Sequence, residues 1–257
     1  MNFITAAKPT GKHAIKLWAV LLWLAVWQAG SMALGQEIFL VSPVSVLVRV
    51  WTLSLTAAFW RAIAFSLARI AGGFMLAMVC GVALAALAAR FQRIETLLAP
   101  PILAIKAIPV ASFIVLVLIW IPSKNLSVFI SFLMVVPVVY ANVLSGIRST
   151  DRQLLEMAQV FALPAVRRVR YIYVSQVLPY FRAACSVGLG LCWKSGIAAE
   201  VIGIPSGSVG ERLYSAKIYL DTPDLFAWTL VIVLISLAFE RLFLRLLDYG
   251  VFRLEGM

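Results

Sequence analysis

Long uncharged runs alternate with short polar segments along most of this chain. Three of these runs, Leu17–Leu34, Ile70–Ala89 and Asn125–Ile147, contain 18, 20 and 23 residues without a charged side chain. A helix of about 20 apolar residues is long enough to cross the core of a bilayer. The three runs therefore predict membrane-spanning helices.

Three further spans are expected where the apolar runs contain a few charges or prolines. They cover about residues 96–121, 177–203 and 225–244. The first contains Pro100, Pro101 and Pro109, which should bend it, because proline lacks the amide that continues a helix. The segment from Ser45 to Trp60 holds Arg49 and has too short a charge-free part to span, so it is expected along the membrane interface. The predicted fold class is an all-α integral membrane protein with six transmembrane helices, forming one membrane domain over residues 1–257.

Composition supports a membrane protein independently of these runs. Hydrophobic residues make up 63% of the chain and charged residues 13%, and the mean hydropathy is +1.00. Soluble domains rarely have such a composition. The apolar run that begins at Leu17 is longer than the core of a cleaved signal peptide, so it is interpreted as a retained first helix.

Lysine and arginine are unevenly distributed between the two sides that six spans define. The side of the chain ends collects Lys8, Lys12, Lys16, Arg90, Arg93, Arg148, Arg152, Arg167, Arg168, Arg170, Arg241, Arg245 and Arg253, whereas the other side has Arg49, Arg61, Lys124, Arg212 and Lys217. Cytoplasmic loops of membrane proteins are enriched in these residues. We therefore expect a multi-pass plasma (inner) membrane protein with both termini in the cytoplasm. This topology accounts for the net charge of +11, and no aromatic-basic module indicates a nucleic-acid partner.

No pattern in the sequence indicates catalysis, a cofactor or a metal. His13 is the single histidine and is expected to be solvated in the N-terminal tail. Residues 188–195 end in Lys-Ser with a glycine six residues before the lysine, but Trp193 replaces the second glycine of a nucleotide-binding loop. The three cysteines lie within predicted spans, where small apolar packing is their expected role.

The segment from Ser149 to Pro179 is a polar, arginine-bearing island between two apolar runs. Thr150 and Gln153 have the form of a capping box, and Asp151 adds negative charge, so a helix should begin here. Four apolar residues recur at helical spacing and form one face of it, namely Leu154, Met157, Ala158 and Phe161. Pro164 should end this helix near Ala162 and start a second segment at an angle. The expected object is a bent helix pair.

Residues 149–179 resemble the cytoplasmic coupling loop, or EAA motif, of permease subunits of ABC importers. Glu156–Ala158 stand where that family has Glu-Ala-Ala, Ala162 stands at the position of its usual glycine, and Val177–Pro179 match its closing apolar-Leu-Pro element. Val174–Ser175 depart from the pattern, replacing an earlier Leu-Pro. The resemblance covers about residues 40–248, and the chain is most similar to the nitrate, sulfonate and taurine permeases.

This resemblance implies a permease that works as a homodimer with an ABC ATPase subunit dimer and an extracytoplasmic solute-binding protein. It also implies that ATPase coupling involves Leu154, Glu156, Met157, Ala158, Phe161 and Ala162. The solutes of similar permeases are small anions such as sulfonates, taurine, nitrate and bicarbonate, or nitrogen heterocycles such as vitamin precursors. Three other interpretations stay open: an ion-coupled secondary transporter, a non-enzymatic membrane scaffold, and an island helix that lies on membrane lipid headgroups.

Charged residues inside predicted spans are candidates for the translocation pathway, because such groups must face protein or water. They are Lys106, Lys194 and Glu200. Lys106 lies between prolines in a helix expected to bend. A cationic Lys194 near mid-span would suit an anionic solute. Glu200 lies about 240° around the helix from Lys194, so the two cannot form a pair on one face, and a structural or gating role is favoured for Glu200.

Overall fold

The structure is a computed structural model that describes residues 16–35 and 39–255, whose regular secondary structure is helical, with no β-strand. The elements are α1 (Leu17–Leu34), α2 (Pro43–Ser54), α3 (Ala57–Arg90), α4 (Gln92–Ala107), α5 (Val110–Val117), α6 (Ser123–Arg148), α7 (Arg152–Val160), α8 (Ala165–Arg168), the π-helical segment η1 (Val169–Tyr173), α9 (Val174–Gly203), α10 (Val209–Ile218) and α11 (Thr222–Glu255). Lys8, Lys12 and His13 lie outside the described residues.

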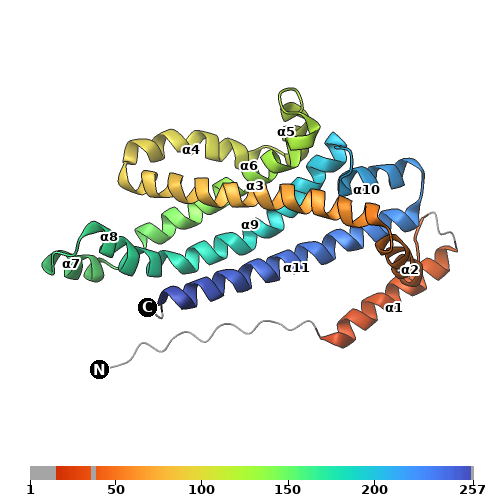
Figure 1. Cartoon of the computed structure of the whole chain (residues 1–257), viewed down its shortest axis with the longest axis horizontal. Helices are drawn as coiled ribbons and strands as arrows, with labels where there is room; N and C mark the ends of the chain where they lie inside the picture. Colours follow the sequence, from red (N-terminus) through yellow and green to blue (C-terminus); the bar gives the residue numbers. More distant parts are fainter. Residues whose placement is uncertain (1–15, 36–38, 256–257) are drawn as a thin grey trace.

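The six expected spans correspond to α1, α3, the α4–α5 pair, α6, α9 and α11. Among the described residues, α1, α3, α6 and the segment Ala165–Gly203 are each long and apolar enough to cross a membrane. The pair α4 and α5 has the required composition but is bent by 107°. Helix α11 has 34 residues, so it is about 51 Å long, and it runs the length of the bundle (Figure 1).

The core lies where α3, α6 and α9 pack together. Phe74, Val139 and Leu189, one from each helix, are fully buried there. Gly196 of α9 allows close approach, because a Cβ at this position would lie 2.7 Å from Cγ1 of Ile70 on α3. Small residues let helix backbones come together in the same way in other membrane bundles. Helix α11 joins the core through an edge-to-face contact of Phe243 with Phe74, whose ring centroids are 5.2 Å apart.

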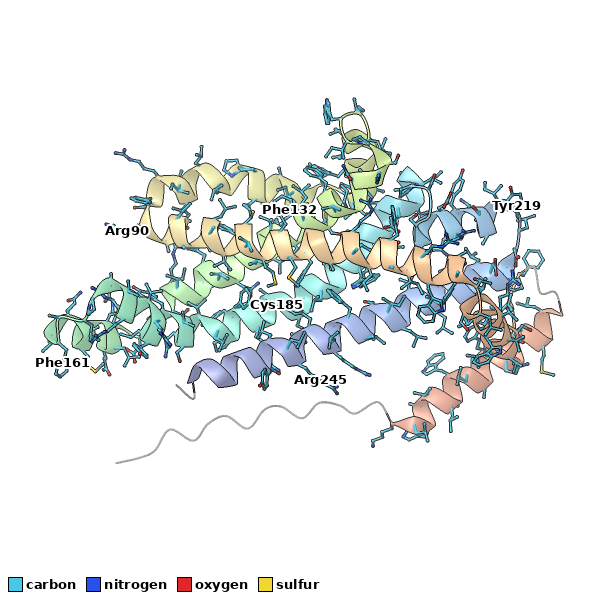
Figure 2. The ribbon with its side chains drawn as sticks, in the orientation of Figure 1. Arg90, Phe132, Phe161, Cys185, Tyr219 and Arg245 are labelled. Carbon is cyan, nitrogen blue, oxygen red and sulfur yellow. The ribbon has the colours of Figure 1, made fainter. Side chains whose placement is uncertain are left out.

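Different helices lie at the two ends of the bundle. Helices α7 and α8, the α3–α4 turn and the C-terminal part of α11 lie at one end, whereas α2 and α10 lie at the other (Figure 1). The labelled side chains of Arg90 and Phe161 belong to the first end, and Tyr219 belongs to the second (Figure 2). We call these the loop end and the α10 end.

Three expected boundaries differ from the structure. The bend of the fourth span coincides with Pro109, which precedes α5, whereas Pro100 and Pro101 lie inside α4. The helix of the fifth span is longer than the expected span of residues 177–203, because it is continuous from Ala165 to Gly203. The expected interfacial segment stops at Ser54, and Thr56 begins α3 by accepting a hydrogen bond from the Phe59 amide at 3.3 Å.

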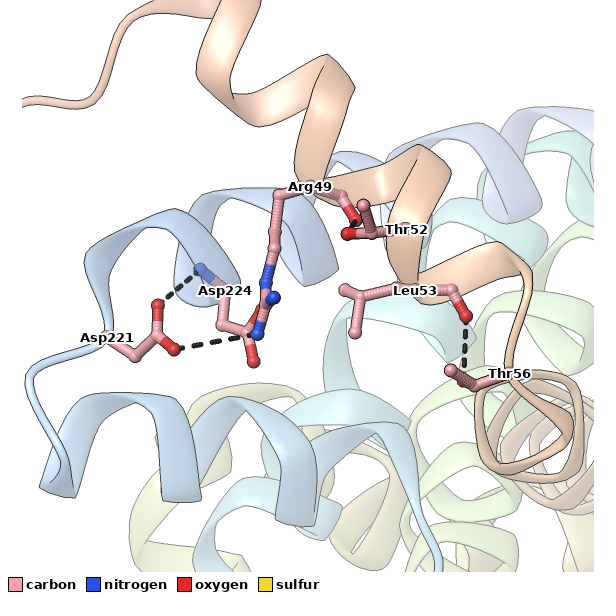
Figure 3. Close-up of polar contacts among 6 residues, drawn as sticks. All are labelled: Arg49, Thr52, Leu53, Thr56, Asp221 and Asp224. Atoms are coloured by element: carbon pink, nitrogen blue, oxygen red, sulfur yellow. Dashed lines mark hydrogen bonds and ion pairs between the residues drawn. The ribbon is translucent and has the colours of Figure 1, made fainter.

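Ion pairing fixes α2 at the α10 end of the bundle (Figure 3). Arg49 of α2 donates a hydrogen bond from Nε to Asp224 Oδ1 and lies 3.7 Å from Asp221 Oδ2. The hydrogen bond to Asp224 raises the pKa of the Arg49 guanidinium above its ordinary value. A short, partly polar helix is thereby joined to the start of α11.

Candidate coupling loop and translocation face

Helix α7 begins at an aspartate cap after the end of α6. The Asp151 carboxylate accepts a hydrogen bond from the Gln153 amide at 2.8 Å. Aspartate suits this position, because it satisfies a free amide and places negative charge at the helix N-terminus. The predicted capping box at Thr150 is wrong. Thr150 is buried, and its hydroxyl donates to the Gly146 carbonyl of α6 at 3.4 Å, so it belongs to the end of the preceding helix.

Helix α7 ends in a Schellman turn that uses an alanine where glycine is usual. The Leu163 amide donates to the Ala158 carbonyl at 2.9 Å, and the Ala162 amide donates to the Gln159 carbonyl at 3.0 Å. Ala162 has a φ of 47°, a left-handed conformation that costs about 1–2 kcal/mol for a residue with a Cβ. The turn geometry is therefore retained with alanine, at a cost in backbone strain.

The second limb of the bent pair is an extension of a spanning helix. Pro164 precedes α8, as predicted, and α8, η1 and α9 continue as one helix from Ala165 to Gly203. Arg167 and Arg170 on this limb are exposed, and Arg168 is half-buried. Helix α7 is thus joined through a single turn to a helix that is long and apolar enough to cross a membrane.

The predicted apolar face of α7 is divided between the interior and the surface. Ala158 is 0% exposed and packs into the chain itself, and Leu154 is half-buried. Met157 and Phe161, one helical turn apart, remain outside, and Phe161 is 71% exposed at the tip of the loop end (Figure 2). Glu156 and Ala162 are also exposed. Among the described residues, Glu156 forms no ion pair with an arginine of the loop.

The three charged residues expected inside spans have different surroundings. Lys106 is exposed in the last turn of α4, next to the 107° bend. Lys194 is exposed on α9, nine residues before Gly203, which places it about 14 Å from that end of the helix. Glu200 is fully buried on another side of α9. Lys194 and Glu200 therefore do not pair, as their spacing predicted.

Lys194 lies on a strip of α9 that the rest of the chain leaves uncovered. At about 100° per residue, Ala183, Val187 and Gly190 lie within about 40° of Lys194 around the helix axis. Ala183 and Val187 are exposed, and a Cβ at Gly190 would meet open space. We call these four residues the open strip. It runs through the middle of the membrane-spanning part of α9.

Polar residues that sequence reasoning missed border the open strip towards α11. Arg182 Nε lies 2.7 Å from Asp248 Oδ1, and the Ser186 hydroxyl donates to Glu240 Oε1 at 3.4 Å. These side chains line a groove of about 670 Å³ between α9 and α11. Arg182 was detectable, because it is a further charge inside the predicted fifth span. Its pairing with a residue 66 positions later was not.

Comparison with protein families identifies the family to which this chain belongs. Residues 73–254, more than half of the chain, match the family model described as binding-protein-dependent transport system inner membrane component. The chain belongs to this family. It is a permease of the inner membrane and a component of a binding-protein-dependent ABC importer, a system that generally includes an ATPase and a solute-binding protein.

The names of the relatives of this permease mention more than one class of solute. SsuC of Escherichia coli (strain K12), assigned to aliphatic sulfonates transport, is 29% identical over 77% of this chain and 76% of its own. The riboflavin transport system permease protein RibX of Chloroflexus aurantiacus is 28% identical over 88% of this chain and 87% of its own. The solved structure of an amino acid ABC transporter with histidines has a TM-score of 0.58 at 19% identity, covering 79% of this chain and 96% of that one. The last comparison supports the fold.

Proposed function

We propose that this permease pairs with a second copy of itself and carries a small organic anion of the sulfonate class. A separate ATPase dimer binds at the loop end and supplies ATP hydrolysis, and an extracytoplasmic binding protein delivers the solute at the α10 end. Both termini then lie in the cytoplasm. The observation that carries this proposal is Lys194, an exposed cation on the open strip at membrane depth.

The charge on the open strip favours an anion over a neutral or cationic solute. Lys194 forms no hydrogen bond or ion pair within the described part of the chain. A lysine at this depth is stable when it faces protein or water rather than lipid. A second copy placed against the open strip would enclose Lys194 in a path between the two chains. Lys106, exposed at the bend of α4, supplies a further cation at membrane depth.

The shape of the open strip favours a second copy as its cover. Ala183 and Gly190 are small, and small residues at helix surfaces permit close contacts between spans. On one flank the strip meets the polar groove with Arg182 and Ser186. On the other flank, Leu191 and Ala198 pack against the cluster of α5, α6 and α9 residues around Ile114 and Ile130. The strip thus lies between two covered faces of α9.

The loop end supplies the surface for the ATPase. Phe161 and Met157 present exposed apolar side chains beyond the spanning helices, and α7 is short and firmly capped at both ends. An exposed apolar side chain on such a helix suits insertion into a groove of a partner. Ala158, buried within the chain, supports this surface from beneath, and Leu154 contributes its exposed edge. Glu156 and Ala162 border the contact.

A nitrogen heterocycle is the second candidate class, because the relative RibX is as similar as SsuC. A neutral heterocycle has no requirement for a lysine in the path. An ion-coupled carrier would take up solute without ATP. One assay distinguishes these alternatives.

The proposal is tested in proteoliposomes that contain the permease with its ATPase, with its binding protein outside and ATP inside. Uptake of labelled ethanesulfonate and of riboflavin is measured. We expect ATP-dependent uptake of ethanesulfonate and at least an about tenfold loss in Lys194→Gln, since one charge-assisted contact contributes about 1.5–3 kcal/mol. The control is Lys124→Gln, an exposed lysine near the start of α6. ATP-independent uptake, riboflavin uptake without ethanesulfonate uptake, or full activity of Lys194→Gln would each refute the proposal.

A further inference from the structure

A single buried carboxyl group joins three helices at the α10 end. Glu200, in the last turn of α9, is 0% exposed. Its Oε2 accepts a hydrogen bond from the Ser66 hydroxyl of α3 at 2.6 Å and from the Gly210 amide of α10 at 3.3 Å. The Ser66 oxygen in turn accepts from the Val209 amide at 3.0 Å. Two oxygen atoms therefore connect α3, α9 and α10.

These contacts satisfy the N-terminus of α10. The first amides of a helix have no acceptor within the helix, and negative charge is favoured there. Ser208 caps the helix by accepting from the Glu211 amide at 2.9 Å, while Glu200 and Ser66 serve Gly210 and Val209. The two first-turn amides without an internal partner are thereby bonded to other helices.

The packing at this point leaves no room for a side chain on α10. A Cβ added at Gly210 would overlap the Cβ of Glu200. The backbone of α10 consequently lies directly on the end of α9, and the carboxyl group of Glu200 reaches the Gly210 amide from the side. Glycine at this position allows an approach that a larger residue would prevent.

The other carboxyl oxygen of Glu200 faces α6. Oε1 is buried and makes no hydrogen bond of ordinary geometry among the described residues, but the buried Ser127 hydroxyl of α6 lies close enough to interact with the carboxyl group. The well-formed hydrogen bonds of Glu200 are those of Oε2 to Ser66 and to the Gly210 amide, and the second of these is directed at α10.

We propose that Glu200 is the positioning residue that holds α10 against α3 and α9. Because α9 continues through η1 into α8, Glu200 then fixes α10 to the same continuous helix that carries Lys194 and ends at the coupling loop. Helix α10 ends in exposed Ile218 and Tyr219, a surface at the end where the binding protein is proposed to act (Figure 2). The contact of α10 with the binding protein rests on the proposed function, whereas the role of Glu200 in holding α10 does not.

The proposal is tested by measuring where α10 lies in the full chain. Spin labels are attached at Lys217→Cys on α10 and Arg61→Cys on α3, both exposed sites, after the three native cysteines are replaced by serine or alanine. Double electron–electron resonance in lipid nanodiscs gives the distance distribution between the labels. We expect one narrow peak in the parent protein and loss of that peak in Glu200→Ala.

Three further variants make the result specific to the hydrogen bonds. Glu200→Gln should restore the narrow peak, because its amide oxygen still accepts from Ser66 and Gly210. Ser66→Ala should broaden it through the loss of the Val209 contact. Ser195→Ala should leave it unchanged, because the buried Ser195 hydroxyl bonds to the Leu191 carbonyl of its own helix at 2.8 Å.

Two outcomes would overturn the proposal. The first is an unchanged narrow peak in Glu200→Ala, and the second is an equal loss in Ser195→Ala, which would show that any buried change in α9 loosens the α10 end. Monodisperse elution of each variant confirms that it is folded. These outcomes require neither transport nor a known solute, so failure here leaves the anion-importer proposal to its own uptake assay.

Discussion

Replacing Phe161 by aspartate addresses the coupling surface most directly. Phe161 is 71% exposed in the single chain, and full burial of a phenylalanine side chain stabilises by about 1.5–3 kcal/mol. Insertion into an ATPase groove therefore makes about 1–2 kcal/mol available at this residue. Aspartate removes that contribution and places an unpaired charge in an apolar contact, which costs at least about 2 kcal/mol more. Together these terms predict binding weaker by more than about 100-fold.

The assay is the affinity of the detergent-purified permease for its ATPase subunit, measured by titration of a fluorescently labelled partner. Gln159→Asp is the matched control, because it introduces the same charge at an exposed polar position two residues away. The control should bind within about twofold of the parent, as exposed charges contribute little. Leu154→Asp is less diagnostic, since Leu154 is half-buried and the change also disturbs the loop. Full binding by Phe161→Asp, or an equal loss in the control, would refute the docking surface and favour contact with lipid headgroups.

Two further predictions concern stability. Ala162→Gly should raise the free energy of unfolding by about 0.5–1 kcal/mol, because relief of the left-handed strain exceeds the added entropy of the unfolded chain; thermal melting checks this, and a lower melting temperature would contradict it. Arg49→Gln should destabilise the α10 end equally at about pH 7 and about pH 9.5, because a raised pKa means that the Arg49 contribution is lost only as the pH rises above the ordinary arginine value. A stability difference that disappears by about pH 9.5 would contradict the ion pair seen with Asp224.

Much of the fold could be predicted because the bilayer imposes length and composition on its spans. Uncharged runs located α1, α3 and α6, and the proline at 109 marked the bend between α4 and α5. The ends of the helices were harder to predict from the sequence. Thr150 and Asp151 both suit a cap, and the choice depends on where α6 stops, which is set by packing. Pro179, which closes the polar island in the sequence, lies inside α9.

The candidate sites were predictable only in part, because side-chain direction depends on distant residues. Spacing placed Ala158 and Phe161 on one face, but the chain covers Ala158 itself and leaves Phe161 free. Lys194 and Glu200 were recognised as charges within a span, whereas the partner of Glu200, Ser66, lies 134 residues away in the sequence. The burial of Glu200 and the exposure of Lys194 follow from this long-range packing.

The π-helical segment η1 has a consequence for the orientation of everything beyond it. A π turn accommodates one residue more than an α turn. If Val169–Tyr173 adopted regular α geometry while α8 stayed fixed, the remainder of α9 would rotate by about 100° and advance by about 1.5 Å. Lys194 would leave the uncovered side of the helix, and a different row of side chains would replace it. Five residues near the loop end thus determine which sector of a 30-residue helix faces the space beside the bundle.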